Sequence, residues 1–299
     1  MALMRTMSAC VAVAEKAGGV LRDIMTSGNL GIIDKGGINN LQTLADKKAQ
    51  LLIVSSLMKH SPKATIIGEE DDVDYTTEEA KSLITLDTSS DVLQHSCPES
   101  LAHINEEDLV IWVDPLDGTK EYTEGRKQDV TVLIGIAAHG EAVAGVIYQP
   151  WYEVQGKETG RTLWGVVGLG AFGFNRQPVP EGRKIITTTR SHMQQSVQDA
   201  IDSCKPDKLI QIGGSGSKCI LVIEGLADAY LFASPGTKKW DTCAGEAIIK
   251  ALGGKMTDVF GNPIHYGADV SYPNKTGVLA AMRDFDFYVS KIPANIMDR

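Results

Sequence analysis

The sequence predicts a mixed fold in two parts, α+β over residues 1–180 and α/β over residues 181–299. Three observations predict it. The chain has 299 residues, and at about 150 residues per domain this length favours two domains. Long β-branched runs separated by short turns fill residues 109–174 and are typical of a largely antiparallel sheet. After the polar stretch 175–182, apolar strands alternate with helical periods, which is the signature of βα units.

The first part begins with two predicted helices. Apolar residues recur at helical spacing over residues 5–26, and a second helix is predicted over residues 44–59. A short buried strand at 64–67 then leads into Gly68-Glu69-Glu70. Residues 71–107 are acidic and weakly periodic, so we expect a helical or loop excursion on the surface there.

The longest apolar runs of the chain are predicted to form the first sheet. Its expected strands are 109–113, 130–137, 142–148, 161–166 and 170–174. The first of these should stop at Asp114-Pro115, because proline cannot continue a ladder. His139-Gly140-Glu141 is the expected turn of a hairpin.

The second part alternates between the two kinds of element. Strands are expected at 184–189, 209–212, 229–233 and 277–281. Helices are expected at 194–203, 217–225, 241–252 and 285–292.

Composition excludes several classes of protein. Hydrophobic residues make up 43% and charged residues 22% of the chain, close to the averages of globular proteins, which argues against disorder and coiled coil. The formal charge of −9 disfavours non-specific binding of nucleic acid, and a phosphorylated substrate would need bound cations to reverse the local field. No run approaches the ~18 apolar residues of a membrane span, and the first residues lack the pattern of a signal peptide.

The five cysteines indicate a reducing compartment. They are odd in number and include no C-x-x-C pair, which argues against a disulfide framework and a structural zinc site. We therefore expect a cytoplasmic protein, with no obligatory protein partner evident.

The sharpest local signal is a D-P-L-D-G-T run that follows a predicted strand. Its proline lets Asp114, the carbonyl of Leu116 and Asp117 converge on one point, and three converging oxygens suit Mg²⁺. The backbone N–H groups of Gly118 and Thr119 would form an anion site beside the metal. The spacing alone is equally compatible with a capped turn after a strand.

Two further acidic motifs follow predicted strands. Glu69-Glu70 by itself is more often a solvated turn, and Asp241 by itself is more often a helix N-cap. With Asp114 and Asp117, one carboxylate from each of these two motifs makes four, enough to hold two Mg²⁺ ions.

Three ordered motifs resemble those of a known family: Gly68-Glu69-Glu70, Asp114-Pro115-Leu116-Asp117-Gly118-Thr119, and Trp240-Asp241 before a helix that ends at Gly253-Gly254. The family is that of the lithium-sensitive, magnesium-dependent phosphomonoesterases, which includes inositol monophosphatase, and the resemblance covers essentially the whole chain. Within it, three further segments resemble the 3′(2′),5′-bisphosphate nucleotidase branch: residues 117–122, 188–192 and 213–218. The resemblance implies a layered αβαβα sandwich of the inositol monophosphatase and fructose-1,6-bisphosphatase type.

The resemblance also implies a role for each site residue. The metal ligands, for two or three Mg²⁺ ions, would be Glu69, Asp114, the Leu116 carbonyl, Asp117 and Asp241. Asp46 and Thr119 would be the catalytic pair that activates the attacking water, because a Thr hydroxyl becomes a useful base when it passes its proton to a carboxylate. The substrate-binding residues would be Gly118, Thr119, Thr189, His192, Gly214 and Lys218.

Parts of this assignment have other interpretations, and two positions depart from the family pattern. Without the resemblance, the 213–218 segment is equally well explained as a glycine-rich βα loop with a solvated lysine, and His192 as a surface residue. Asn40 stands where the family usually has Asp, and Leu44 where close relatives have Lys or a similar residue. We interpret the first change as structural, since Asn also caps and bonds locally.

The expected function is hydrolysis of the 3′-phosphate of 3′-phosphoadenosine 5′-phosphate (adenosine 3′,5′-bisphosphate) to AMP and phosphate, with the 5′-phosphosulfate analogue as a further substrate and lithium as an inhibitor. The nearest alternatives are an inositol polyphosphate 1-phosphatase, which the 43–46 segment resembles, and an inositol monophosphatase. A catalytically silent phosphate- or metal-binding regulator is the non-enzymatic alternative. The presence of both Asp46 and Thr119 argues against it, because a protein that only binds has no evident use for them.

Overall fold

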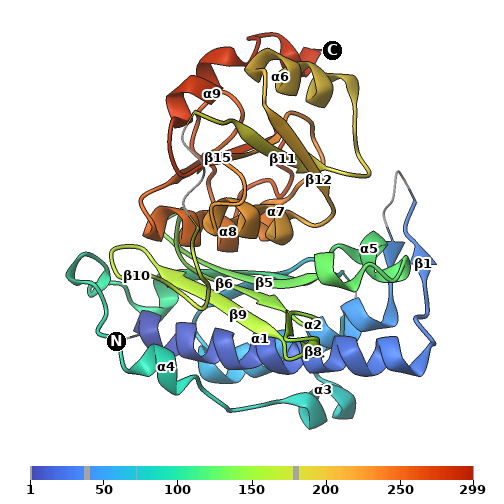
Figure 1. Ribbon diagram of the computed structural model, residues 1–299. Coiled ribbons are helices and arrows are strands. Elements are labelled where there is room, and N and C mark those ends of the chain that lie inside the picture. The colour runs from blue at the N-terminus through green and yellow to red at the C-terminus, as the bar shows by residue number, and fades with distance from the viewer. Residues whose placement is uncertain (1, 37–40, 72, 178–181, 299) are drawn as a thin grey trace.

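Helices and sheets alternate in five layers in the computed structural model (Figure 1), which describes residues 2–36, 41–71, 73–177 and 182–298. The helices α1 (Ala2–Ser27) and α2 (Leu44–His60) cover one face of a six-stranded sheet. The helices α7 (Ser215–Ile223) and α8 (Lys239–Ala251) lie between this sheet and a five-stranded one, whose far side carries α6 (Gln195–Cys204) and α9 (Phe285–Lys291). The predicted αβαβα layering is confirmed. The expected boundary at residue 180 lies outside the described residues.

The six-stranded sheet is built from the first part of the chain. In spatial order its strands are β10 (Gly170–Phe172), β9 (Arg161–Val166), β6 (Glu141–Gln149), β5 (Thr131–Ala138), β4 (Leu109–Asp117) and β3 (Thr65–Gly68). Only the β3–β4 pair is parallel. Short strands outside it pair as β1 (Ile33–Asp34) with β2 (Leu41–Gln42) and β7 (Glu153–Val154) with β8 (Lys157–Glu158).

This sheet is buried on both faces, which explains its continuous apolar runs. Along β5, Val132, Ile134 and Ile136 belong to the core under α1 and α2, whereas Leu133 and Ala137 belong to the core shared with α8. Successive side chains of a strand point to opposite faces. The sheet is therefore the wall between two hydrophobic cores.

In its described part, the surface excursion holds only short helices. They are α3 (Glu78–Leu83), α4 (Ser90–Leu93) and the 3₁₀ turns η1 (Glu99–Leu101) and η2 (Glu106–Asp108). Two more short elements, α5 (Thr119–Thr123) and η3 (Lys127–Asp129), link β4 to β5, and η4 (Ile296–Asp298) lies near the C-terminus.

The prediction that β4 stops at Asp114-Pro115 was wrong. The pairing with β5 is regular up to Asp114, which lies opposite Leu133, then shifts register and resumes with Asp117 opposite Thr131. Pro115 lies in this β-bulge, where the ladder is already interrupted, so its missing N–H costs no bond. The bulge brings the side chains of Asp114 and Asp117 close together.

The five-stranded sheet is mixed. Its spatial order is β12 (Lys208–Ile212), β11 (Ile185–Thr189), β13 (Ala229–Phe232), β15 (Val278–Ala281) and β14 (Lys255–Thr257). The first three strands are parallel, and β15 pairs antiparallel with both of its neighbours. Strand β14 was not predicted, because three residues of sequence Lys-Met-Thr carry no periodic signal.

Two glycines bring α8 close to the first sheet. A Cβ atom on Gly145 of β6 would lie 2.5 Å from the carbonyl oxygen of Ala244, and one on Gly135 of β5 would lie 2.5 Å from Cβ of Cys243. Any larger residue at either position would push α8 away from the sheet. This packing places the first turn of α8 over the end of β4.

All five cysteines are buried and free. Burial raises the pKa of the Cys219 thiol to about 12, and it raises the pKa of Cys243 well above its ordinary value. Among the helices of the described ranges, none combines the length and apolar character that crossing a bilayer requires.

Candidate active site

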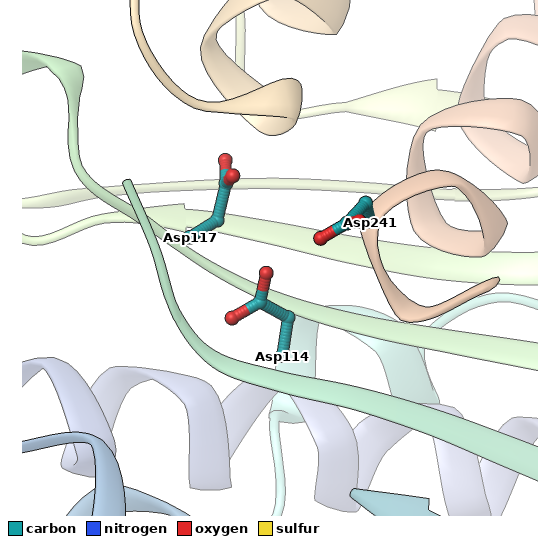
Figure 2. Close-up of side chains that lie close together, drawn as sticks. All are labelled: Asp114, Asp117 and Asp241. Atoms are coloured by element: carbon teal, nitrogen blue, oxygen red, sulfur yellow. The ribbon is translucent and has the colours of Figure 1, made fainter. Parts of the chain in front are cut away.

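Three aspartates from two parts of the chain meet between the layers. Asp114 and Asp117 come from the β4 bulge, and Asp241 comes from the first turn of α8. One carboxylate oxygen of each lies within 4.8 Å of those of the other two, and Figure 2 shows the three side chains converging. The sequence predicted this group, although 124 positions separate Asp117 from Asp241.

The bulge itself orients the first carboxylate. Oδ1 of Asp114 accepts a hydrogen bond of 3.0 Å from the backbone N–H of Leu116. The carbonyl of Leu116, a predicted metal ligand, accepts one of 3.2 Å from Oγ1 of Thr119. Gly118 follows with a φ of 90° and precedes α5, whose first residue is Thr119.

Asp117 is held from two directions. Its Oδ1 accepts a hydrogen bond of 2.8 Å from the N–H of Ser215, and its Oδ2 accepts bonds of 2.7 Å from the N–H of Gly216 and from Oγ1 of Thr131. Ser215 and Gly216 open α7, whose N-terminus thus faces a carboxylate of the protein itself. Asp117 therefore joins the first sheet to the helical layer above it.

Asp241 is fixed by hydrogen bonds to the backbone of the helix N-cap. It is the third residue of α8, and its Oδ2 accepts a hydrogen bond of 2.5 Å from the backbone N–H of Lys238, which occupies the N-cap. The N-cap alternative for Asp241 was therefore misplaced by three residues, although its carboxylate does serve the cap.

Glu69 lies outside the group of three but acts on it electrostatically. It follows β3, and its N–H donates to the carbonyl of Val113, one residue before Asp114. Its charge is among the causes that raise the pKa of both Asp114 and Asp241. Nζ of Lys238 lies 3.6 Å from its Oε1, so Glu69 is not the solvated turn residue of the alternative interpretation.

The pKa values of this cluster are all raised. Burial raises the pKa of Asp114 well above its ordinary value, and the neighbouring carboxylates raise it further. Burial also raises the pKa of Asp117, against the charge of Lys218, and the pKa of Glu69, against the charge of Lys238. For Asp241, burial and the neighbouring charges give a pKa of about 7.

This donor set fits a hard divalent cation. It consists of carboxylate oxygens, together with a carbonyl two residues from Asp114, and Mg²⁺ prefers oxygen ligands. The crowding of like charges in a water-poor region costs free energy that a cation would remove. The charges and the ligand chemistry thus suit a divalent cation, and its identity as Mg²⁺ stays a prediction.

A second pair of residues lies beside the cluster. Oγ1 of Thr119 lies 3.1 Å from Oδ1 of Asp46, a buried residue of the first turn of α2. Oδ2 of Asp46 accepts hydrogen bonds from the N–H of Thr43 at 2.7 Å and from its hydroxyl at 2.5 Å. Burial raises the pKa of Asp46 to about 7. This arrangement suits a proton relay that works near neutral pH.

The predicted nucleotide-binding residues gather at the ends of two parallel strands. Thr189 ends β11 opposite Ile212 of β12, and its hydroxyl accepts a hydrogen bond of 3.1 Å from the N–H of His192. Gly214 follows β12 and borders Asp117, since a Cβ on it would lie 2.8 Å from Oδ2 of that carboxylate. Gly214 therefore borders the metal cluster, and Thr189 lies at the end of the strand beside the one that leads to it.

Lys218 is buried, so the alternative of a solvated lysine was wrong. It is 5% exposed, and its ammonium donates to the carbonyls of Ile212, at 3.4 Å, and of Gly214. Burial lowers its pKa, while the charge of Asp117 opposes that change. Its contact with a 5′-phosphate stays a prediction.

Several supporting residues were not predicted. Thr131 and the α7 amides hold Asp117, Lys238 holds Asp241 and Glu69, and the Glu70 side chain accepts from Lys35 and Gln42. Only the Thr43-to-Asp46 spacing carried a usable signal, that of a capping box. The Asn40 position lies outside the described residues, and Leu44 is exposed at the start of α2.

Comparison with known proteins places the chain among related sequences. It matches the model of the inositol monophosphatase family over residues 3–292. It is 51% identical to the 3′(2′),5′-bisphosphate nucleotidase 1 of Homo sapiens, covering 98% of this chain and 96% of the relative. It is 50% identical to the protein of the same name from Rattus norvegicus, again covering 98% and 96%.

A solved structure shares the fold. It is CysQ from Bacteroides thetaiotaomicron, described as a bacterial member of the inositol monophosphatase family. The TM-score is 0.67 at 26% identity, covering 92% of this chain and 97% of CysQ. The layered arrangement is therefore that of this family, as the sequence motifs predicted.

Proposed function

The chain belongs to the inositol monophosphatase family, and from this premise we propose that it is a magnesium-dependent phosphatase that hydrolyses the 3′-phosphate of adenosine 3′,5′-bisphosphate. The products are AMP and inorganic phosphate. The observation that carries the proposal is the convergence of Asp114, Asp117 and Asp241 beside the Thr119–Asp46 pair. The two nucleotidases that match at 50% and 51% identity over nearly their whole length support this choice of substrate.

The metal ligands would be Glu69, Asp114, the Leu116 carbonyl, Asp117 and Asp241, holding two or three ions. When bound, Mg²⁺ would offset the negative charge of the transferring phosphoryl group, lower the pKa of a water molecule and stabilise the leaving alkoxide. The protein contributes fixed ligand positions, because hydrogen bonds at Leu116, at the start of α7 and at Lys238 already hold the three aspartates.

The proton relay is the chain's own contribution to the chemical step. The attacking water gives a proton to Oγ1 of Thr119 as the Thr119 hydroxyl passes its own proton to Oδ1 of Asp46. The other oxygen of Asp46 is occupied by Thr43, so Oδ1 is the one free to receive it. With a pKa of about 7, Asp46 is deprotonated in part of the molecules at neutral pH and is more basic than an ordinary carboxylate.

Substrate selection would fall to the side of the site formed by Thr189, His192, Gly214 and Lys218, with Gly118 at the scissile phosphate. Gly214 borders Asp117 and joins this side of the site to the metal cluster. We also propose inhibition by lithium, hydrolysis of the 5′-phosphosulfate analogue, a division into two domains near residue 180, and a cytoplasmic location. The buried free cysteines support a reducing compartment.

One assay tests the function against its alternatives. Phosphate release is measured from adenosine 3′,5′-bisphosphate, inositol 1,4-bisphosphate and inositol 1-phosphate, with Mg²⁺ and with EDTA. We expect the highest kcat/KM on the nucleotide and no release in EDTA. A preference for an inositol phosphate would overturn the substrate assignment, and no release from any of the three would favour the silent regulator.

A further inference from the structure

Gln50 is a buried polar residue to which the proposed chemistry gives no role. It lies on α2, one helical turn after Asp46, so the two side chains lie on the same face of the helix. Both side chains are buried, with Gln50 0% and Asp46 1% exposed. A buried amide needs hydrogen-bond partners, and Gln50 finds two of its three in the turn that carries Glu69.

The amide of Gln50 grips this turn at two points. Its Oε1 accepts a hydrogen bond of 2.8 Å from the backbone N–H of Glu70, and its Nε2 donates one of 2.6 Å to the carbonyl of the same residue. Nε2 also donates to the hydroxyl of Tyr75 at 2.9 Å. A donor and an acceptor on one amide thus fix both the position and the direction of the chain immediately after Glu69.

Gly68 makes this grip possible. A Cβ atom there would lie 2.5 Å from Cδ and from Oε1 of Gln50. Such a contact is far shorter than any that side chains tolerate, so a larger residue would displace the amide. Gly68 and Gln50 are therefore one structural unit, and Glu69 lies between the glycine and the gripped residue.

We propose that Gln50 is a positioning residue, which holds the turn that carries Glu69 in the position that metal binding requires. This inference rests on the proposed function, because it takes Glu69 as a metal ligand. The grip links the end of β3 directly to α2, the helix that carries Asp46. Without it, Glu69 is held from the side of β4 through its N–H bond to Val113, and its register against α2 is lost.

The test measures metal binding as well as activity. Gln50→Met keeps the length and helix propensity of the side chain but removes all three hydrogen bonds. Mg²⁺ binding to the substrate-free protein is measured by calorimetry, and the Mg²⁺ concentration for half-maximal activity is measured alongside. We expect both to weaken by about 10- to 100-fold, the usual cost of losing a partner that orients a metal ligand. Saturating Mg²⁺ should restore most of kcat.

Gly68→Ala is an independent variant, because it displaces the amide without changing Gln50, and it should weaken Mg²⁺ binding in the same way. It decides the question if Gln50→Met does not fold. Ser56→Ala is the matched control. Ser56 is buried on the same helix and accepts a hydrogen bond of 3.0 Å from the backbone N–H of Thr85. Its loss should lower stability by about 1 kcal/mol and leave Mg²⁺ binding unchanged.

The outcomes separate this inference from the function beneath it. Wild-type Mg²⁺ affinity, within twofold, in both Gln50→Met and Gly68→Ala would overturn the role of Gln50, even if both variants were less stable. A wild-type chain that bound no Mg²⁺ would overturn the proposed function, and this inference with it.

Discussion

The hydroxyl oxygen of Thr119 lies 3.1 Å from Oδ1 of Asp46, although 73 positions separate the two residues. Each belongs to the first turn of its helix, α5 for Thr119 and α2 for Asp46. The contact therefore exists only when the end of β4 is docked on α2. The proposed proton relay therefore depends directly on the packing of α2 against the first sheet.

Removal of either member of this pair should slow turnover. We expect Thr119→Ala and Asp46→Asn each to lower kcat by about 10²-fold or more, which is the usual cost of losing a general base. The double variant should lose little beyond the worse single one, because the two residues act as a unit. Initial rates at saturating Mg²⁺ check this, with Thr119→Ser as the variant that keeps the hydroxyl. Fully additive losses would show that the residues work separately.

Neutralising Asp114 should have opposite effects with and without metal. In EDTA, Asp114→Asn should be at least as stable as wild type, since it relieves repulsion from Asp117 and Asp241. In Mg²⁺ it should gain little stability and lose all measurable turnover. Wild type should gain about 2.7 kcal/mol at a Mg²⁺ concentration of 100 times Kd. Thermal unfolding under both conditions gives the comparison, and equal Mg²⁺ stabilisation of both proteins would remove Asp114 from the ligand set.

Two residues of the proposed nucleotide side should respond differently to truncation. Lys218 donates to the loop that holds Asp117, so Lys218→Ala should lower kcat/KM for both adenosine 3′,5′-bisphosphate and inositol 1-phosphate, and by more for the nucleotide, whose 5′-phosphate Lys218 is proposed to contact. His192 is only half-buried, and His192→Ala should cost roughly 10-fold on the nucleotide alone, about 1.4 kcal/mol. Paired kcat/KM measurements decide the matter. An equal loss on both substrates for His192→Ala would exclude it from nucleotide recognition.

Glu246 should make the stability of the metal-free protein depend on pH. Its buried carboxylate accepts a hydrogen bond of 2.7 Å from the Tyr266 hydroxyl, and burial raises its pKa from 4.5 to about 7. The folded chain therefore holds more protons than the unfolded chain between these values. Its contribution to the free energy of unfolding should fall as pH rises from about 4.5 to about 7.

Glu246→Gln keeps the shape of the side chain and removes its titration. The fall in the free energy of unfolding between pH 5 and pH 8 should therefore be smaller than in wild type by up to about 3 kcal/mol. Urea unfolding in EDTA at several pH values measures it. The control is Glu141→Gln, since Glu141 also lies near Lys250 but is exposed. A wild-type slope in Glu246→Gln would show that Glu246 is ionised at neutral pH.

Two glycine-to-alanine variants should change the free energy of unfolding in opposite directions. Gly145→Ala places a Cβ 2.5 Å from the Ala244 carbonyl and should destabilise by about 1 to 3 kcal/mol. Gly19→Ala, in α1, meets nothing closer than 3.9 Å and should stabilise by up to about 1 kcal/mol. Chemical denaturation of both variants tests this, and a neutral Gly145→Ala would show that α8 moves without cost.

Most of the fold was predictable because its strands and helices are long. Burial on both faces gives β4, β5 and β6 continuous apolar runs, and helical periodicity marks α1 and α2. The bulge at Pro115 was not predictable from the rule that proline ends a strand. That rule describes regular ladders. Here a β-bulge interrupts the ladder at the proline and brings the carboxylates of Asp114 and Asp117 together.

The acidic residues of the candidate site were predictable, but their supports were not. Carboxylates at strand ends and before helices are visible as local motifs. The bonds from Ser215 and Gly216 to Asp117, and from Gln50 to Glu70, join segments whose register only the three-dimensional packing sets. The resemblance also assigned Gly214, at the start of α7, to substrate binding, whereas the structure directs the next two amides to Asp117.

The buried cysteines allow local unfolding of each hydrophobic core to be measured by thiol labelling. A thiol reacts as its thiolate, and five thiols removed from solvent are protected twice, by exclusion of the reagent and by suppressed ionisation. Alkylation of Cys10, Cys219 and Cys243 therefore requires the helices and sheets packed around them to separate. Cys10 lies in the core under α1, whereas Cys219 and Cys243 lie in the core around α7 and α8. Mass-resolved labelling over time would thus distinguish, in a single native sample, which of the two cores loosens first.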